Sequence, residues 1–244
     1  MKQNVSIQKY QDSFEKHYHN VRVSEQRIYS NQQIAKLPEI EPGHPHANEW
    51  IVRKRSSEQL IELLKKKKTT LNILEVGCGN GWLCSRLSAI QNSKITGMDI
   101  NRIELMQAVT VFEKKDNLHF IYGDIRSASL KQHAFDIIVF AASIQYFSSF
   151  TDIINTALSL LVSTGEIHII DTPFYKKDEK ENAFQRTKHY YTSIGFEEMS
   201  DFYFHHCLDD LNAFKHKIIY NPNNIVNKLK KNHQPFYYII IKQY

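Results

Sequence analysis

The sequence predicts a doubly wound α/β fold, in which a mostly parallel sheet is covered by helices on both faces. Short apolar runs, typical of buried strands, alternate along the chain with segments of helical periodicity. Three of only eight glycines in 244 residues, Gly77, Gly79 and Gly81, directly follow one of these runs. Alternation of this kind makes successive strands parallel and gathers the turns after them at one edge of the sheet.

The first 69 residues precede this alternation and are predicted to form a helical extension or lid. Residues 1–37 are polar with scattered aromatic side chains, which favours one or two loosely amphipathic helices. Three prolines and a glycine within 38–47 predict a loop. A further helix is expected at 49–67, and we place a domain boundary between residues 69 and 70.

Residues 70–244 are predicted to carry seven strands and the helices between them. The predicted strands are 71–76, 94–100, 118–122, 135–141, 166–171, 196–204 and 235–242, and the predicted helices are 81–90, 101–115, 150–162 and 177–194. Asn101 followed by Glu104 is typical of a helix start. The last strand leaves no room for a crossover, so we expect it to pair antiparallel with 196–204. Residues 208–234 would then be an inserted helical segment on the substrate side.

Charge and composition exclude several classes of protein. There are 31 basic and 26 acidic residues, and four of the cations form one run at 65–68, which is read as a solvated helix end rather than a nucleic-acid contact. Three cysteines without a Cys-x-x-Cys pair argue against a disulfide framework and a zinc site. No signal core and no run of about 18 apolar residues is present. We therefore expect a soluble cytoplasmic protein without a nucleic-acid partner or a membrane span.

The glycine-rich turn is the first candidate for a ligand site. The strand at 71–76 runs into Gly77-Cys78-Gly79-Asn80-Gly81, and a helix follows. Such a turn brings free backbone N–H groups close to a ligand. Trp82 occupies the place of the third glycine in the dinucleotide fingerprint, and the Gly-Lys-Ser/Thr of a P-loop is missing. A nicotinamide-dependent oxidoreductase is therefore the less favoured alternative.

Carboxylates follow the first three strands. Glu75 lies at the tip of the first strand, Asp99 at the end of the second, and Asp124 just after the third. A carboxylate in the position of Asp99 is able to accept both hydroxyls of a ribose. Asp124, followed by Ile125, is suited to an adenine amino group and ring face. Because strand carboxyl ends share one edge, we expect these groups to surround one ligand.

Four segments together resemble a known family. Residues 73–81, Ile-Leu-Glu-Val-Gly-Cys-Gly-Asn-Gly, resemble motif I of the class I S-adenosylmethionine-dependent methyltransferases. Residues 97–100, Gly-Met-Asp-Ile, resemble the acidic second motif of that family, and 123–125, Gly-Asp-Ile, its adenine-reading motif. Residues 135–139 resemble its fourth strand. The resemblance covers about 70–242 in order and implies a Rossmann-like sheet.

The resemblance also implies the cofactor and its site. S-adenosylmethionine would bind with its methionine part on the glycine loop, its ribose on Asp99 and its adenine on Asp124 and Ile125. Glu75 would place the cofactor amino group through water. The cofactor-binding residues expected on this basis are Glu75, Gly77, Cys78, Gly79, Gly81, Asp99, Ile100, Asp124, Ile125, Ala141 and Gln145.

Methyl transfer mainly requires alignment of donor and acceptor, and some acceptors also need a base. With 12 histidines in the chain the base stays open, and His205, His206 and Tyr146 are the candidates. No acid follows the fourth strand before Asp152, so we expect no catalytic metal. The hypothesis is methyl transfer to a small-molecule acceptor, at oxygen, nitrogen or carbon, by a monomer or homodimer. A macromolecular acceptor (RNA or protein) and a partner module without turnover are the alternatives.

Overall fold

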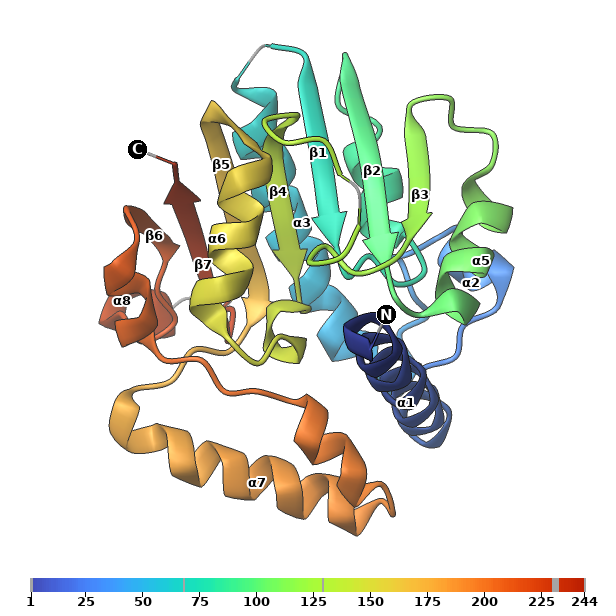
Figure 1. Ribbon diagram of the computed structural model, residues 1–244, viewed down its shortest axis with the longest axis vertical. Helices are drawn as coiled ribbons and strands as arrows, with labels where there is room; N and C mark the ends of the chain where they lie inside the picture. Colours follow the sequence, from blue (N-terminus) through green and yellow to red (C-terminus); the bar gives the residue numbers. More distant parts are fainter. Residues whose placement is uncertain (1, 68, 129, 230–232, 244) are drawn as a thin grey trace.

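The computed structural model describes residues 2–67, 69–128, 130–229 and 233–243, with side chains from residue 12 onward. In this part of the chain, seven strands form one sheet in the order β3-β2-β1-β4-β5-β7-β6 (Figure 1). The strands are β1 (Leu71–Val76), β2 (Ser93–Asp99), β3 (Leu118–Tyr122), β4 (Phe135–Ala141), β5 (Leu161–Thr172), β6 (His216–Tyr220) and β7 (Tyr237–Lys242). β7 pairs antiparallel with β5 and β6, whereas the other pairs are parallel. The predicted doubly wound α/β fold with an antiparallel last strand is confirmed.

Helices precede and separate the strands. They are α1 (Lys2–Ser24), α2 (Asn31–Ile34), α3 (Ala47–Lys65), α4 (Trp82–Leu87), α5 (Arg102–Phe112), α6 (Phe150–Leu160), α7 (Lys180–Ser193) and α8 (Ile225–Lys228). Helix α5 begins as predicted, because the Asn101 side chain accepts the backbone N–H of Glu104 at 3.1 Å. Among the described helices, none combines the length and the apolar character that crossing a bilayer requires.

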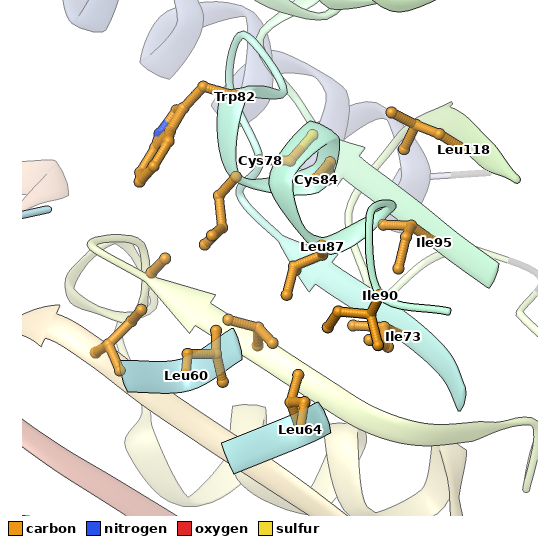
Figure 2. Packing of buried hydrophobic residues seen from close by; sticks show 14 of the residues in the cluster. Leu60, Leu64, Ile73, Cys78, Trp82, Cys84, Leu87, Ile90, Ile95 and Leu118 are labelled. Atoms are coloured by element: carbon orange, nitrogen blue, oxygen red, sulfur yellow. The ribbon is translucent and has the colours of Figure 1, made fainter. Parts of the chain in front are cut away.

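Helices bury both faces of the sheet. Neighbouring strand residues point to opposite faces and therefore pack against different helices. Ile73 packs with Leu60 of α3 and Leu87 of α4, as Figure 2 shows. Its neighbour Leu74 belongs to a second apolar cluster, with Ile154 of α6. Figure 1 accordingly shows α6 in front of the sheet and α3 behind it. Packing from both sides holds β1, and therefore the turn that follows it, in a fixed position.

The predicted strand at 196–204 is wrong. The chain there forms a 3-10 helix, η3 (Glu197–Phe202), and the partner of β7 is instead β6. Phe196, Met199 and Phe202 are three residues apart, which is the repeat of a 3-10 helix rather than of a strand. The stretch 208–234 is not an all-helical insertion, because β6 lies within it. In the sheet, β7 lies between β5 and β6.

A third apolar cluster lies beyond the carboxyl ends of the strands. Phe14 and Val21 of α1 pack there with Tyr191 of α7 and with Met199 and Phe202 of η3. In Figure 1, α1 and α7 lie below the carboxyl ends of β1 and β4. These segments cover the sheet edge that carries the glycine-rich turn. The division of the chain at residue 69 stays a prediction.

Candidate functional site

The glycine-rich turn is packed so closely that side chains would not fit at several of its positions. Gly77, Gly79 and Gly81 all have positive φ angles, of 75°, 50° and 74°. A Cβ on Gly77 would lie 2.5 Å from the Cβ of Ser143, and one on Gly79 would lie 2.7 Å from the Glu104 Oε2. Because Gly77 and Gly79 have no side chains, their backbone atoms face the space at the strand ends directly.

Three adjoining cavities open at this edge of the sheet. The first, the strand-end cavity, runs from the glycine turn past Asp99 to Asp124. The second, the glycine-loop cavity, is lined by Glu75, Cys78 and Trp82. The third, the arginine cavity, lies between α1, α3 and the segment around η3. Tyr146, in the short 3-10 helix η1 (Ile144–Tyr146) after β4, lines all three, so the cavities meet at this side chain.

Asp99 connects β2 to the glycine turn. Its Oδ2 accepts the backbone N–H of Gly79 at 2.6 Å, and its Oδ1 accepts that of Asn101 at 2.7 Å. Burial raises the pKa of Asp99 to about 7, although these two hydrogen bonds favour the carboxylate. Each oxygen retains a lone pair for a ligand hydroxyl, so this carboxylate is a ready acceptor in the wall of the strand-end cavity.

Asp124 is paired with a residue that the sequence did not single out. Both of its carboxylate oxygens accept hydrogen bonds from the Arg126 guanidinium, the shortest at 2.5 Å from a terminal nitrogen to Oδ2. Arg126 also lies over the ring of Phe147, at 5.5 Å from its centroid. Asp124, Ile125, Arg126 and Phe147 all line the strand-end cavity. The arrangement offers an apolar surface beside a neutralised carboxylate.

The glycine-loop cavity has charges of both signs. Glu75 is buried, and burial raises its pKa to about 8, while the Cys84 thiol donates to its Oε2 at 2.8 Å. Glu104 and two arginines, Arg22 and Arg53, complete the charged wall. Two potential anions and two cations around one cavity suit a ligand group that is itself a zwitterion.

The arginine cavity is lined by Asp171, whose backbone conformation is unusual. Asp171 lies in β5 where the pairing with β7 shifts, between Ile169 and Thr172, and its φ angle of 56° is in the left-handed region that residues other than glycine rarely adopt. Its Oδ2 accepts the Ser56 hydroxyl at 2.8 Å, and burial raises its pKa to about 6. Glu49 differs, because Arg53 and Arg27 overcome the effect of its burial and lower its pKa to about 2.

Most of the predicted site residues come together around these cavities. They are Glu75, Gly77, Cys78, Gly79, Asp99, Ile100, Asp124, Ile125, Ala141, Gln145 and Tyr146. Gly81 lies apart from all three cavities, and a Cβ there would lie 2.7 Å from the Phe120 ring. Its lack of a side chain serves the packing of α4 instead.

The two candidate histidines point elsewhere. The His205 Nε2 is bonded to the Thr187 hydroxyl at 2.9 Å, and the His206 Nε2 to the Ile144 carbonyl oxygen at 3.1 Å. Neither lines any of the three cavities. Burial lowers the pKa of His205 to about 4 and also lowers the pKa of His206. We expected them beside the acceptor because residues 196–204 were predicted to form a strand, and this segment contains η3 instead.

Helix α1 supplies wall residues, of which sequence reasoning missed Tyr18 and Arg22. Phe14 and Tyr18 line the strand-end cavity, and Arg22 lines the other two. The spacing of four residues places all three on one helix face, which is the signal that would have found them. Among the described residues, no group of three or more His, Cys, Asp or Glu side chains is arranged to hold a metal ion.

Comparison with known proteins identifies the family of this chain. A family model described as a methyltransferase domain matches residues 67–232, which is more than half of the chain. The chain belongs to the methyltransferase-domain family. The resemblance to the class I S-adenosylmethionine-dependent methyltransferases is thereby confirmed, and S-adenosylmethionine is the cofactor of that class.

Relatives of this methyltransferase domain act on different acceptors. A malonyl-[acyl-carrier protein] O-methyltransferase of Acetivibrio thermocellus is 31% identical over 47% of this chain and 40% of its own length. The alignment thus spans less than half of that relative. The YcgJ protein of Bacillus subtilis has the same fold, with a TM-score of 0.56 at 15% identity over 76% of this chain and 98% of its own. A geranyl diphosphate C-methyltransferase of Streptomyces coelicolor A3(2), solved with S-adenosyl-L-homocysteine, has a TM-score of 0.56 at 11% identity over 84% of this chain and 88% of its own.

Proposed function

We propose that this protein transfers a methyl group from S-adenosylmethionine to a small-molecule acceptor. The observation that carries the proposal is the arrangement of the glycine turn, Asp99, Asp124 and Glu75 around two adjoining cavities at the carboxyl ends of the strands. Relatives named as methyltransferases of malonyl-[acyl-carrier protein] and of demethylmenaquinone support the reaction type. Bound S-adenosylmethionine would supply an electrophilic methyl carbon on a sulfonium, and in-line attack by the acceptor would release the thioether S-adenosylhomocysteine.

The strand-end cavity suits the adenosine half of this cofactor. Asp99 would accept hydrogen bonds from the ribose hydroxyls, and Ile100 and Ile125 offer apolar surface to the adenine. The Nδ2 of Asn101 is buried in the same wall without a hydrogen-bond partner among the described residues, and it is available to donate to a ligand. Asp124 would contribute mainly by fixing Arg126 and the turn after β3.

The glycine-loop cavity suits the methionine half, which is a zwitterion. Glu75 and Glu104 face it as acceptors for an ammonium group, and Arg53 faces it as a donor for a carboxylate. The absence of side chains at Gly77 and Gly79 leaves the backbone open to that half. The residues present therefore fit the cofactor at both ends.

The acceptor would occupy the arginine cavity. Tyr18, Gln145 and Tyr146 line both this cavity and the glycine-loop cavity, so transfer would take place between these side chains. Their role is to hold the acceptor in line and to exclude water. Asp171, with its raised pKa of about 6, is the wall residue best suited to take a proton from an acceptor that has one to lose.

Calorimetry with S-adenosylhomocysteine tests the proposal directly. We expect one site per chain with a micromolar dissociation constant, and no heat above dilution when NADH is titrated instead. Release of S-adenosylhomocysteine from S-adenosylmethionine in the presence of a metabolite panel then tests turnover. If the protein bound NADH and not S-adenosylhomocysteine, the proposal would be wrong and the oxidoreductase alternative would replace it.

The affinity for S-adenosylhomocysteine should depend on pH through Asp99. Burial raises the pKa of this group to about 7, and it must be ionised to accept both ribose hydroxyls. Protonation therefore competes with binding below this pKa, and affinity should rise about tenfold between about pH 6 and about pH 8. Titrations in buffers of equal ionic strength measure this. The Asp99→Asn variant, which does not ionise, is the control, and an unchanged pH profile in it would contradict the assignment.

A further inference from the structure

The arginine cavity holds three guanidinium groups, and two of them are paired. Arg27 lies 2.5 Å from the Glu49 Oε2 through a terminal nitrogen and 3.0 Å from the Glu25 Oε2 through Nε. Arg53 donates from Nε to the Glu49 Oε1 at 2.9 Å. Their charge is therefore largely balanced by the protein itself, so neither is an unoccupied anion site.

Arg22 differs from both of these arginines. Its nearest carboxylate oxygen is the Glu104 Oε1, 3.9 Å from its Nε, which is beyond hydrogen-bond distance. That Nε is buried and, like the Arg27 Nε, has no hydrogen-bond partner among the described residues, but the Arg27 Nε lies only 3.0 Å from a carboxylate oxygen. The guanidinium lies over the Tyr18 ring, 5.3 Å from its centroid, which fixes its place at the cavity wall. A buried N–H donor without an acceptor is costly unless a ligand supplies one.

Aromatic rings form the wall beside Arg22. Tyr18 and Tyr146 meet edge to face with centroids 5.7 Å apart, and Tyr146 and Tyr203 do the same at 5.9 Å. All three line the arginine cavity. Rings in this arrangement offer faces and edges on which a flat ligand packs, and burial keeps their hydroxyls un-ionised by raising their pKa values. The cavity thus combines an aromatic wall with a guanidinium whose carboxylate partner, Glu104, lies beyond hydrogen-bond distance.

We propose that the acceptor of this protein is a small planar carboxylate, with its acid group on Arg22 and its ring or unsaturated body against Tyr146 and Tyr203. The inference rests on the proposed function, because it assigns the arginine cavity to the acceptor. A carboxylate matches the planar guanidinium with two parallel hydrogen bonds. The carboxylate that binds Arg22 has two possible sources, the acceptor or the methionine end of the cofactor, and the experiment separates them.

The test uses the full chain saturated with S-adenosylhomocysteine, with benzoate as the probe and benzamide as its uncharged match. Ligand-detected NMR titration measures both, and calorimetry measures S-adenosylhomocysteine. We expect saturable benzoate binding, with benzamide at least about tenfold weaker. Arg22→Gln should remove that preference, and it should weaken benzoate binding more than binding of S-adenosylhomocysteine, because Arg53 remains to face the methionine half. Arg102→Gln removes an arginine that also lies over a tyrosine ring, Tyr122, but outside the three cavities, and should change neither affinity.

The remaining outcomes of these titrations would contradict either this inference or the proposed function. Equal binding of benzoate and benzamide, or no saturable binding of benzoate, would overturn the inference. Loss of S-adenosylhomocysteine affinity in Arg22→Gln, with benzoate binding retained, would assign Arg22 to the cofactor carboxylate and would also overturn it. Failure of the unaltered protein to bind S-adenosylhomocysteine would instead reject the proposed function.

Discussion

Replacing Gly79 by valine should abolish binding of S-adenosylhomocysteine. Gly79 has a φ angle of 50° and lines both the strand-end and the glycine-loop cavity. A Cβ there would lie 2.7 Å from the Glu104 Oε2, and the two methyl groups of valine would extend from it at the point where backbone meets ligand. We expect a loss of at least about 100-fold, or roughly 2.7 kcal/mol, in calorimetric titrations.

Gly195→Val is the matched control for this change. Gly195 also has a positive φ angle, of 82°, but a Cβ there would meet no atom within 4 Å, and it lies outside the three cavities. Both variants pay the backbone strain of about 1–2 kcal/mol for an L-residue in the left-handed region, so both should melt at a lower temperature. Only Gly79→Val should lose the ligand. Affinity close to that of the unaltered protein in Gly79→Val would contradict the assignment of the turn.

Asp99→Ala should weaken binding of S-adenosylhomocysteine by about 2–4 kcal/mol, or roughly 30-fold to 1000-fold. The change removes the acceptor for the ribose hydroxyls. It also leaves the N–H groups of Gly79 and Asn101 without their acceptor, which loosens the turn at the other side of the ligand. The loss should therefore exceed that of a single surface hydrogen bond, and calorimetry at about pH 8 measures it with Asp99 ionised in the unaltered protein.

Asp136→Ala provides the comparison for this second prediction. The Asp136 Oδ2 also accepts a backbone N–H from the neighbouring strand, that of Asn72 at 2.8 Å, but at the amino ends of the strands. Loss of this hydrogen bond should lower the melting temperature without changing the dissociation constant. Equal loss of affinity in both variants would show that Asp99 acts only through stability.

The sequence predicts the sheet well because its signals are local. Apolar runs such as 135–141 identify buried strands, and glycines followed by a helix identify the turn after β1. The carboxylates Glu75 and Asp99 come together because parallel strands end at the same edge. These features depend on neighbours in the chain and on one rule of topology, so they can be predicted without a structure.

The parts that were mispredicted or missed depend on contacts between distant segments. β6 is an edge strand with mostly exposed side chains, so its apolar pattern is weak. The segment from Phe196 to Phe202 contains enough apolar residues for a strand. Because these residues are three positions apart, a 3-10 helix directs them toward Phe14 and Tyr191. The base candidates His205 and His206 were placed by that incorrect strand. Arg22 and Tyr18 were missed because α1 meets the site only through the fold.

The position of α1 has a consequence for how acceptor preference changes within the family. The family model begins at residue 67, yet half of the described residues around the arginine cavity lie outside the matched range, mostly on α1 and α3. The shared region, inside the match, carries the glycine turn together with Tyr146 and Tyr203, whereas the private region outside the match carries Tyr18 and Arg22 of the arginine cavity. Substitution at Tyr18 or Arg22 can therefore alter the fit of the proposed acceptor while the glycine turn stays unchanged. Similarity confined to the shared region therefore identifies the methyl donor of the reaction and does not identify the acceptor.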